Sequence, residues 1–136
     1  MEPETELPGY ASPAEGLAFL LGQEGGCSTL ESAAAALNTD AAAVAGMIGR
    51  GEVVGYRDRE GQYHVPVWQF APSGGLVPGI AEVLAEIREV LPNSGPLFGF
   101  SFFLQPDPLC GDQTPLEALR SGRIADVKLA VQGWRS

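Results

Sequence analysis

The sequence predicts a mainly α protein, with a small helical bundle in the C-terminal half preceded by a helix-turn-helix-like module with a β-hairpin wing. Three observations predict this fold class. Capping boxes, in which a Ser or Thr is followed three residues later by Glu, begin at Ser12, Ser28 and Thr114. Apolar residues repeat at helical spacing across residues 80–91. Residues 53–67 surround a turn and alternate in polarity, as hairpin strands do.

The first half of the chain is predicted to contain a lead and one module. Residues 1–11 are rich in Glu and Pro and are expected to form a flexible lead, and the module follows over residues 12–70. Its predicted elements are a helix over 12–24, an Ala-rich helix over 29–37, a second helix over 40–49, and a hairpin with strands 53–57 and 62–67. Asp40 is a further candidate cap. Pro66 has no backbone N–H, so we expect its strand at a sheet edge.

The second half is predicted to be a helical domain over residues 79–136, which follows a linker at 71–78. Its predicted helices are 80–91, which Pro92 ends, then 95–104, 115–120 and 123–132. The segment 95–104 is nearly all apolar and is predicted to be a buried helix, with a strand as the alternative for so short a run.

Composition argues against several classes of protein. No apolar run is long enough to span a bilayer, and the N-terminal residues are acidic where a signal peptide needs cations. We therefore expect a cytoplasmic protein with no membrane partner. Cys27 and Cys110 are far apart and His64 is the single histidine, so we expect reduced thiols, no metal site and no cofactor.

The charge of the chain is strongly acidic and unevenly distributed. The formal net charge is −9, and residues 1–49 contain seven acids and no Lys or Arg. Such a segment repels a phosphate backbone, because non-specific affinity for DNA comes mainly from cations that displace counterions. The acidity favours a basic protein partner. The alternative is that it only keeps the protein soluble.

The sequence has few groups that could carry catalysis, and we expect that the protein is not an enzyme. It contains no Gly-rich phosphate loop followed by Lys and no Gly-x-Ser-x-Gly elbow. Glu82 and Glu86 lie one helical turn apart, which is typical of a solvated helix face. His64 is expected to be a surface residue of the hairpin, and Cys110 a structural loop thiol.

Residues 28–70 resemble a small winged helix-turn-helix of the excisionase or MerR type. In such domains the second helix enters the major groove and the hairpin contacts phosphate. The candidate DNA-binding cations are Arg50, Arg57, Arg59 and His64. The start of the second helix, Asp40 to Ala43, has no bidentate donor for a base edge. A dimerisation or packing role for this module is therefore an equal alternative.

A set of residues in the C-terminal half follows a signature with fixed spacings. The pattern is an aromatic-Leu pair, a Pro in a small loop, then Gly-x-x-Thr-Pro-Leu-x-x-Leu and a following Gly. The matching residues are Phe103, Leu104, Pro106, Pro108, Gly111, Thr114, Pro115, Leu116, Leu119 and Gly122. This stretch resembles the toxin-binding domain of Xre/MbcA/ParS-type antitoxins, and the resemblance covers roughly the C-terminal half of the chain.

The resemblance implies an antitoxin that neutralises a RES-domain toxin, an enzyme that degrades NAD or transfers its ADP-ribose to a protein. It implies a helical bundle that packs against the toxin and closes its NAD cleft, and a homodimer or a hetero-oligomer with the toxin. The residues expected at that interface are Leu109, Gly111, Thr114, Pro115, Arg120, Arg123, Trp134, Arg135 and Ser136. Trp134 is expected to meet a partner surface, whereas Leu116 and Leu119 are expected to lie in the core.

Three functional hypotheses remain open on the sequence alone. The leading one is the antitoxin. The alternative is a DNA-binding transcriptional regulator, an autorepressor whose C-terminal bundle serves oligomerisation. The third is an interaction protein without a toxin. Many family members carry a basic helix-turn-helix, whereas this N-terminal half is acidic and Ala-rich, which weakens the expectation of autoregulation rather than that of neutralisation.

Overall fold

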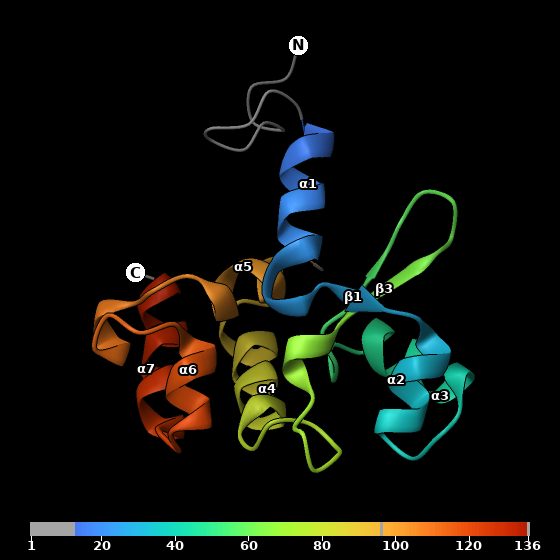
Figure 1. Ribbon diagram of the computed structural model, residues 1–136. Coiled ribbons are helices and arrows are strands. Elements are labelled where there is room, and N and C mark those ends of the chain that lie inside the picture. The colour runs from blue at the N-terminus through green and yellow to red at the C-terminus, as the bar shows by residue number, and fades with distance from the viewer. Residues whose placement is uncertain (1–12, 96, 136) are drawn as a thin grey trace.

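The computed structural model describes residues 13–95 and 97–135 and shows a mainly helical protein with a small antiparallel sheet, which confirms the predicted fold class. In Figure 1, α2 (Leu30–Ala36) and α3 (Ala41–Gly49) lie on one side, α6 (Pro115–Arg120) and α7 (Ile124–Arg135) on the other, and α4 (Ile80–Val90) between them. None of the helices among these residues is long and apolar enough to cross a membrane.

The first described helix, α1 (Pro13–Gly22), stands above the rest of the molecule and contacts α5 (Phe98–Leu104) (Figure 1). The α-helix ends earlier than the predicted residue 24, and a 3-10 turn, η2 (Gln23–Gly25), follows it. The backbone turns there because Glu24 and Gly25 have φ values of 53° and 97°, in the left-handed region that interrupts an α-helix. The predicted cap Ser12 lies outside the described residues.

The two helices of the helix-turn-helix-like module begin at side-chain caps. Asp40 Oδ1 accepts a hydrogen bond from Ala43 N at 2.8 Å and caps α3, as predicted. The prediction for α2 was wrong by one residue, because Thr29 Oγ1, and not Ser28, accepts from the backbone, at Ser32 N. Ser28 is unavailable as a cap because it lies in a strand and its hydroxyl donates to Val65 O.

The sheet has the order β1-β3-β2, in which β3 (Tyr63–Pro66) pairs antiparallel with β1 (Cys27–Ser28) and with β2 (Tyr56–Arg57). The predicted hairpin is present with shorter strands than expected. The prediction that the Pro66 strand lies at an edge was wrong, since β3 is the central strand. Pro66 is tolerated there because β2 pairs only with Tyr63 and His64, so at Pro66 the strand has a partner on one side alone, at Cys27 of β1.

The helices of the C-terminal half follow the predicted order. The apolar segment before residue 104 is a helix and not a strand, and it buries Phe100, Phe102 and Phe103. Helix α6 begins at a complete capping box, in which Thr114 Oγ1 accepts from Glu117 N at 3.1 Å and Glu117 Oε1 accepts from Thr114 N at 2.9 Å. These two hydrogen bonds confirm the predicted start of α6 at Thr114.

One hydrophobic cluster contains residues from both sides of the predicted linker. Val54 and Trp68, from the first half, are buried together with Ile80, Phe103, Leu116 and other residues of the C-terminal helices. Trp68 follows β3 in the 3-10 turn η3 (Val67–Gln69) and contacts the rings of α5. A smaller cluster lies beneath α2 and α3 and includes Val44 and Val65.

Candidate partner-binding surface

Two large apolar side chains stand half-exposed at one edge of the C-terminal bundle. Leu109 comes from the 3-10 turn η4 (Pro108–Cys110) and Trp134 from the last turn of α7, and each is 49% exposed. They line a shallow hollow of about 440 Å³ together with Asp107, Pro108, Ala130 and Gly133. An exposed Trp beside an exposed Leu in a concavity is typical of a protein-binding surface.

Local hydrogen bonds hold Leu109 in its outward position. Asp107 Oδ1 accepts from Leu109 N at 2.9 Å, and Asp107 O accepts from Cys110 N, so the turn is capped at its start. Gly111 and Asp112 then take left-handed backbone conformations with φ values of 67° and 66°. This tight turn directs Cys110 into the core, where it is fully buried, and leaves Leu109 in solvent. Burial raises the pKa of the Cys110 thiol, in agreement with a structural role.

Trp134 combines exposure with a fixed orientation. Its ring meets Phe98 edge-on with ring centroids 5.1 Å apart, and it contacts Phe102 at 6.5 Å. Such aromatic pairs stabilise an orientation by about 0.5–1.5 kcal/mol. The tryptophan therefore presents a positioned apolar face to solvent.

The predicted interface arginines are placed in different ways. Arg123 Nε donates to Asp126 Oδ2 at 2.9 Å and its Nη1 donates to Gln113 Oε1 at 3.0 Å, so it ties the loop after η4 to the start of α7. Arg120 is exposed and donates to the Trp68 carbonyl oxygen at 3.4 Å. Arg135 is the last residue of α7. Ser136 lies outside the described residues.

The remaining predicted residues divide between surface and core. Gly111 is exposed, Thr114 is half-buried at its cap, and Pro115 is buried in the first turn of α6. Leu116 and Leu119 are core residues, as predicted. Three residues that line the hollow were not singled out from the sequence: Asp107, the buried Ala130 and Gly133. The turn signal around Asp107 was visible in the sequence, whereas the approach of α7 to that turn was not.

The candidate DNA-binding cations lie in the other half of the molecule. Arg57 and Arg59 are exposed on the hairpin, and the Arg57 guanidinium lies 5.9 Å from the centre of the Tyr63 ring. Arg50 is paired with Glu52 at 3.1 Å, which also lowers the pKa of the Glu52 carboxyl. The fourth candidate, His64, has Nε2 2.8 Å from Asp58 Oδ2.

That His64 contact, with hydrogen bonds from the hairpin backbone, lowers the pKa of Asp58. The carboxylates of Glu52 and Asp58, which pair with Arg50 and His64, reduce the positive electrostatic potential of this module.

Among residues 13–95 and 97–135, no group of three His, Cys, Asp or Glu side chains is arranged to hold a metal ion.

Comparison with known proteins bears on the fold alone. No protein-family model and no curated protein matches the chain. The chain is similar to the NMR structure of Rv2175c, with a TM-score of 0.67, 20% sequence identity, and 85% of each chain covered. At this identity the likeness shows that the two proteins share a fold over most of their lengths.

Proposed function

We propose that this protein is the antitoxin of a type II toxin-antitoxin system and that it binds a RES-domain toxin and blocks its NAD-binding cleft. The proposal rests on the resemblance of Phe103 to Gly122 to the toxin-binding domain of Xre/MbcA/ParS-type antitoxins. The structural observation that carries it is the pair of half-exposed side chains, Leu109 and Trp134, around one hollow.

In this proposal, the toxin inserts an apolar side chain between Leu109 and Trp134. Asp107, which lines the same hollow, supplies a negative charge that suits a basic toxin surface. Arg123 acts as a positioning residue, because it holds the loop that carries Leu109 through Gln113. Arg120, which is exposed, is available for acids of the toxin.

The test compares two leucine variants in co-expression with a candidate RES-domain toxin. Leu109→Ser and Leu129→Ser remove the same side chain from positions of similar exposure, 49% and 52%, but only Leu109 lines the hollow. We expect Leu109→Ser to bind the toxin about 30-fold more weakly, the size of a hot-spot loss of about 2 kcal/mol. Leu129→Ser should bind as the native chain does. Equal binding by the two variants would reject this surface.

The function itself is tested with the native chain. Cells that express the toxin should lose NAD or accumulate ADP-ribosylated protein, and co-expression should reverse that effect while the two proteins copurify. A native chain that neither copurifies with the toxin nor restores growth would contradict the antitoxin proposal. This outcome is separate from the leucine comparison, which locates the contact.

A DNA-binding regulator is the second candidate function. It is favoured by the arrangement of α2, α3 and the β2-β3 hairpin, whose exposed Arg57 and Arg59 are suited to phosphate contact. The exposed residues of α3 include Ala42 and Gly49, which offer no side-chain donor to a base edge. Binding would therefore depend mainly on phosphate contacts and fall steeply with salt.

This candidate is tested with DNA from the protein's own promoter at low salt. Arg57→Ala combined with Arg59→Ala should abolish binding, while Lys128→Ala, on α7, removes a cation outside the module and should not. No detectable binding by the native chain at low salt would rule out DNA recognition.

A further inference from the structure

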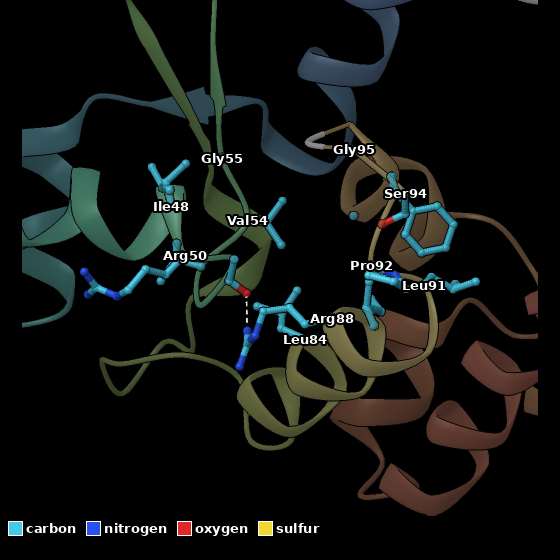
Figure 2. A pocket seen from close by; sticks show the side chains of 16 residues that line it. Ile48, Arg50, Val54, Gly55, Leu84, Arg88, Leu91, Pro92, Ser94 and Gly95 are labelled. Carbon is cyan, nitrogen blue, oxygen red and sulfur yellow. Dashed lines mark hydrogen bonds between the residues drawn. The ribbon is translucent and has the colours of Figure 1, made fainter.

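A second hollow lies between the helix-turn-helix-like module and the C-terminal helices. It has a volume of about 480 Å³ and is bounded by the end of α3 and residues 53–55 on one side, and by α4 and the start of α5 on the other (Figure 2). It is separate from the Leu109–Trp134 hollow, with which it shares no lining residue. Its size is within the range of small-molecule sites, about 300–1,000 Å³.

The walls of this hollow are apolar. Ile48 and Val54 come from the first module, while Leu84, Leu91 and Phe98 come from α4, the residue after it, and α5. The labelled side chains of Val54 and Leu84 approach the space from opposite sides (Figure 2). A ligand in this space would therefore contact both halves of the molecule at once.

Glycines leave part of the space open. A Cβ atom at Gly49 or Gly95 would meet no heavy atom within 4 Å. At Gly55 the backbone is closely packed, since a Cβ atom there would lie 2.5 Å from Ile48 Cδ1. The lining of the hollow therefore combines close packing at Gly55 with open space beside Gly49 and Gly95.

The charged side chains that line the hollow, among the described residues, are two arginines and no acid. This is notable in a chain with 17 acidic and 8 basic residues. The Arg50 guanidinium is occupied, because Glu52 accepts from its Nε at 3.1 Å and from its Nη2 at 3.3 Å. Arg88, which also lines the hollow, donates from Nη1 to the Gly51 carbonyl oxygen, as the dashed line in Figure 2 shows. Its remaining N–H groups are suited to a carboxylate.

We propose that this hollow binds a small amphipathic carboxylate, whose apolar body fills the space between Val54, Leu84 and Phe98 and whose carboxylate meets Arg88. This site is independent of the antitoxin proposal, because it uses none of the residues of the Leu109–Trp134 surface. A bound ligand bridges the two halves and stabilises the folded chain by mass action.

The experiment uses the native 136-residue chain and 4-phenylbutyrate as the probe. In a ¹⁵N-¹H NMR titration, we expect saturable shifts in residues 48–55 and 84–99, with a dissociation constant below about 1 mM, the affinity that a ligand of this size can reach. The neutral isostere 4-phenylbutyramide should bind about tenfold more weakly, since it lacks the charge-assisted hydrogen bond.

A matched pair of variants tests the role of Arg88. Arg88→Gln should weaken 4-phenylbutyrate binding about tenfold and leave the amide unaffected, whereas Lys128→Gln, which removes one positive charge elsewhere, should change neither. A thermal melt establishes that each variant is folded, and the carboxylate-amide comparison on the native chain needs no variant.

Each of the following results would overturn the proposal. The first is the absence of saturable shifts up to 10 mM probe, about ten times the expected limit on the dissociation constant. The second is a set of shifts centred on Leu109 and Trp134, which would place the probe in the other hollow. The third is equal affinity for the carboxylate and the amide, or unchanged carboxylate affinity in Arg88→Gln, which would remove the anionic recognition.

Discussion

Gln69 is a fully buried polar residue that joins two segments of the chain. Its Oε1 accepts from Val54 N at 3.0 Å, and its Nε2 donates to Val54 O at 2.8 Å and to Pro66 O at 3.2 Å. The Gln69 side chain therefore satisfies the backbone N–H and C=O of Val54, a buried residue that lies outside the strands. Nothing in the sequence around Gln69 distinguished it from a surface glutamine, because its partner lies 15 residues away.

Replacement of Gln69 by Leu should destabilise the protein by about 3 kcal/mol, since Val54 N–H and C=O would both stay buried without partners. The free energy of unfolding, measured by urea denaturation, checks this. Gln62→Leu is the matched control, because Gln62 has an exposed side chain on the hairpin and should change stability by less than about 0.5 kcal/mol. A loss below about 1 kcal/mol in Gln69→Leu would contradict the assigned role.

At the scale of elements, the helix starts were the features most accessible to sequence reasoning. The Thr114–Glu117 box and the Asp40 cap involve residues only three apart, so their pattern can be read directly. The sheet was less accessible. Strand β1 is two residues long and pairs with β3 across 37 residues, and no local pattern marks it. The same pairing moved the cap of α2 from Ser28 to Thr29.

Loss of the α6 cap should have a measurable cost. Thr114→Ala removes the acceptor for Glu117 N and should lower the free energy of unfolding by about 1 kcal/mol, the usual value for a helix N-cap. Thr39→Ala serves as the control, because the Thr39 side chain is not a cap in the structure. Thermal denaturation of the two variants under one buffer condition compares them. Equal melting temperatures would show that the box does not stabilise α6.

The hairpin should show a pH-dependent stability through Asp58. Its folded-state pKa is lowered, first by the hydrogen bond with His64 and then by the Gln62 backbone N–H, so Asp58 stabilises the folded state above its unfolded pKa, near 3.9. That contribution is lost as pH falls through the lowered folded value. We expect the melting temperature of Asp58→Asn to be below that of the native chain at pH 6.

The difference in melting temperature between Asp58→Asn and the native chain should shrink as the pH is lowered below about 4. Glu60→Gln controls for charge, because it neutralises a side chain in the same turn while its backbone N–H still donates to Asp58. A difference between Asp58→Asn and the native chain that stays constant from pH 6 to pH 3 would contradict the linkage.

At the scale of the whole molecule, one core crosses the segment 71–78 that the sequence predicts to be a linker. The cluster that contains Val54 and Trp68 also contains Cys110 and the buried residues of α4 to α7, and Cys27 packs against it. Because this cluster contains residues of both halves, we expect the two halves to unfold together. The division into two domains, by contrast, would let them unfold separately.

The two cysteines provide a test of this coupling. The pKa of Cys27 is raised by burial to about 11 and that of Cys110 is raised as well, so both thiols should alkylate slowly in the folded protein at pH 8. We expect both to become reactive at the same urea concentration, coincident with the loss of helical circular dichroism. The variants Cys27→Ser and Cys110→Ser, each with one thiol left, show which alkylation rate belongs to which cysteine. Two separate midpoints would instead support independent domains.

The candidate site shows the same division between local and long-range information. The motif from Pro106 to Leu119 includes the half-exposed Leu109, and Trp134 is half-exposed as well, which its expected contact with a partner surface requires. The outward direction of Leu109 and the inward direction of Cys110 depend on how η4 packs against α7. Arg123, which is expected at the interface, joins Gln113 to the start of α7, a contact between segments that the sequence does not reveal.

The sequence by itself determined the helical class and most helix boundaries, because these depend on contacts within about four residues of the chain. Only the tertiary structure decided the central place of β3, the hydrogen bonds between the Gln69 side chain and Val54, and the two hollows. These depend on segments that are distant in sequence and meet by burial of apolar surface, which is non-directional and leaves no local pattern.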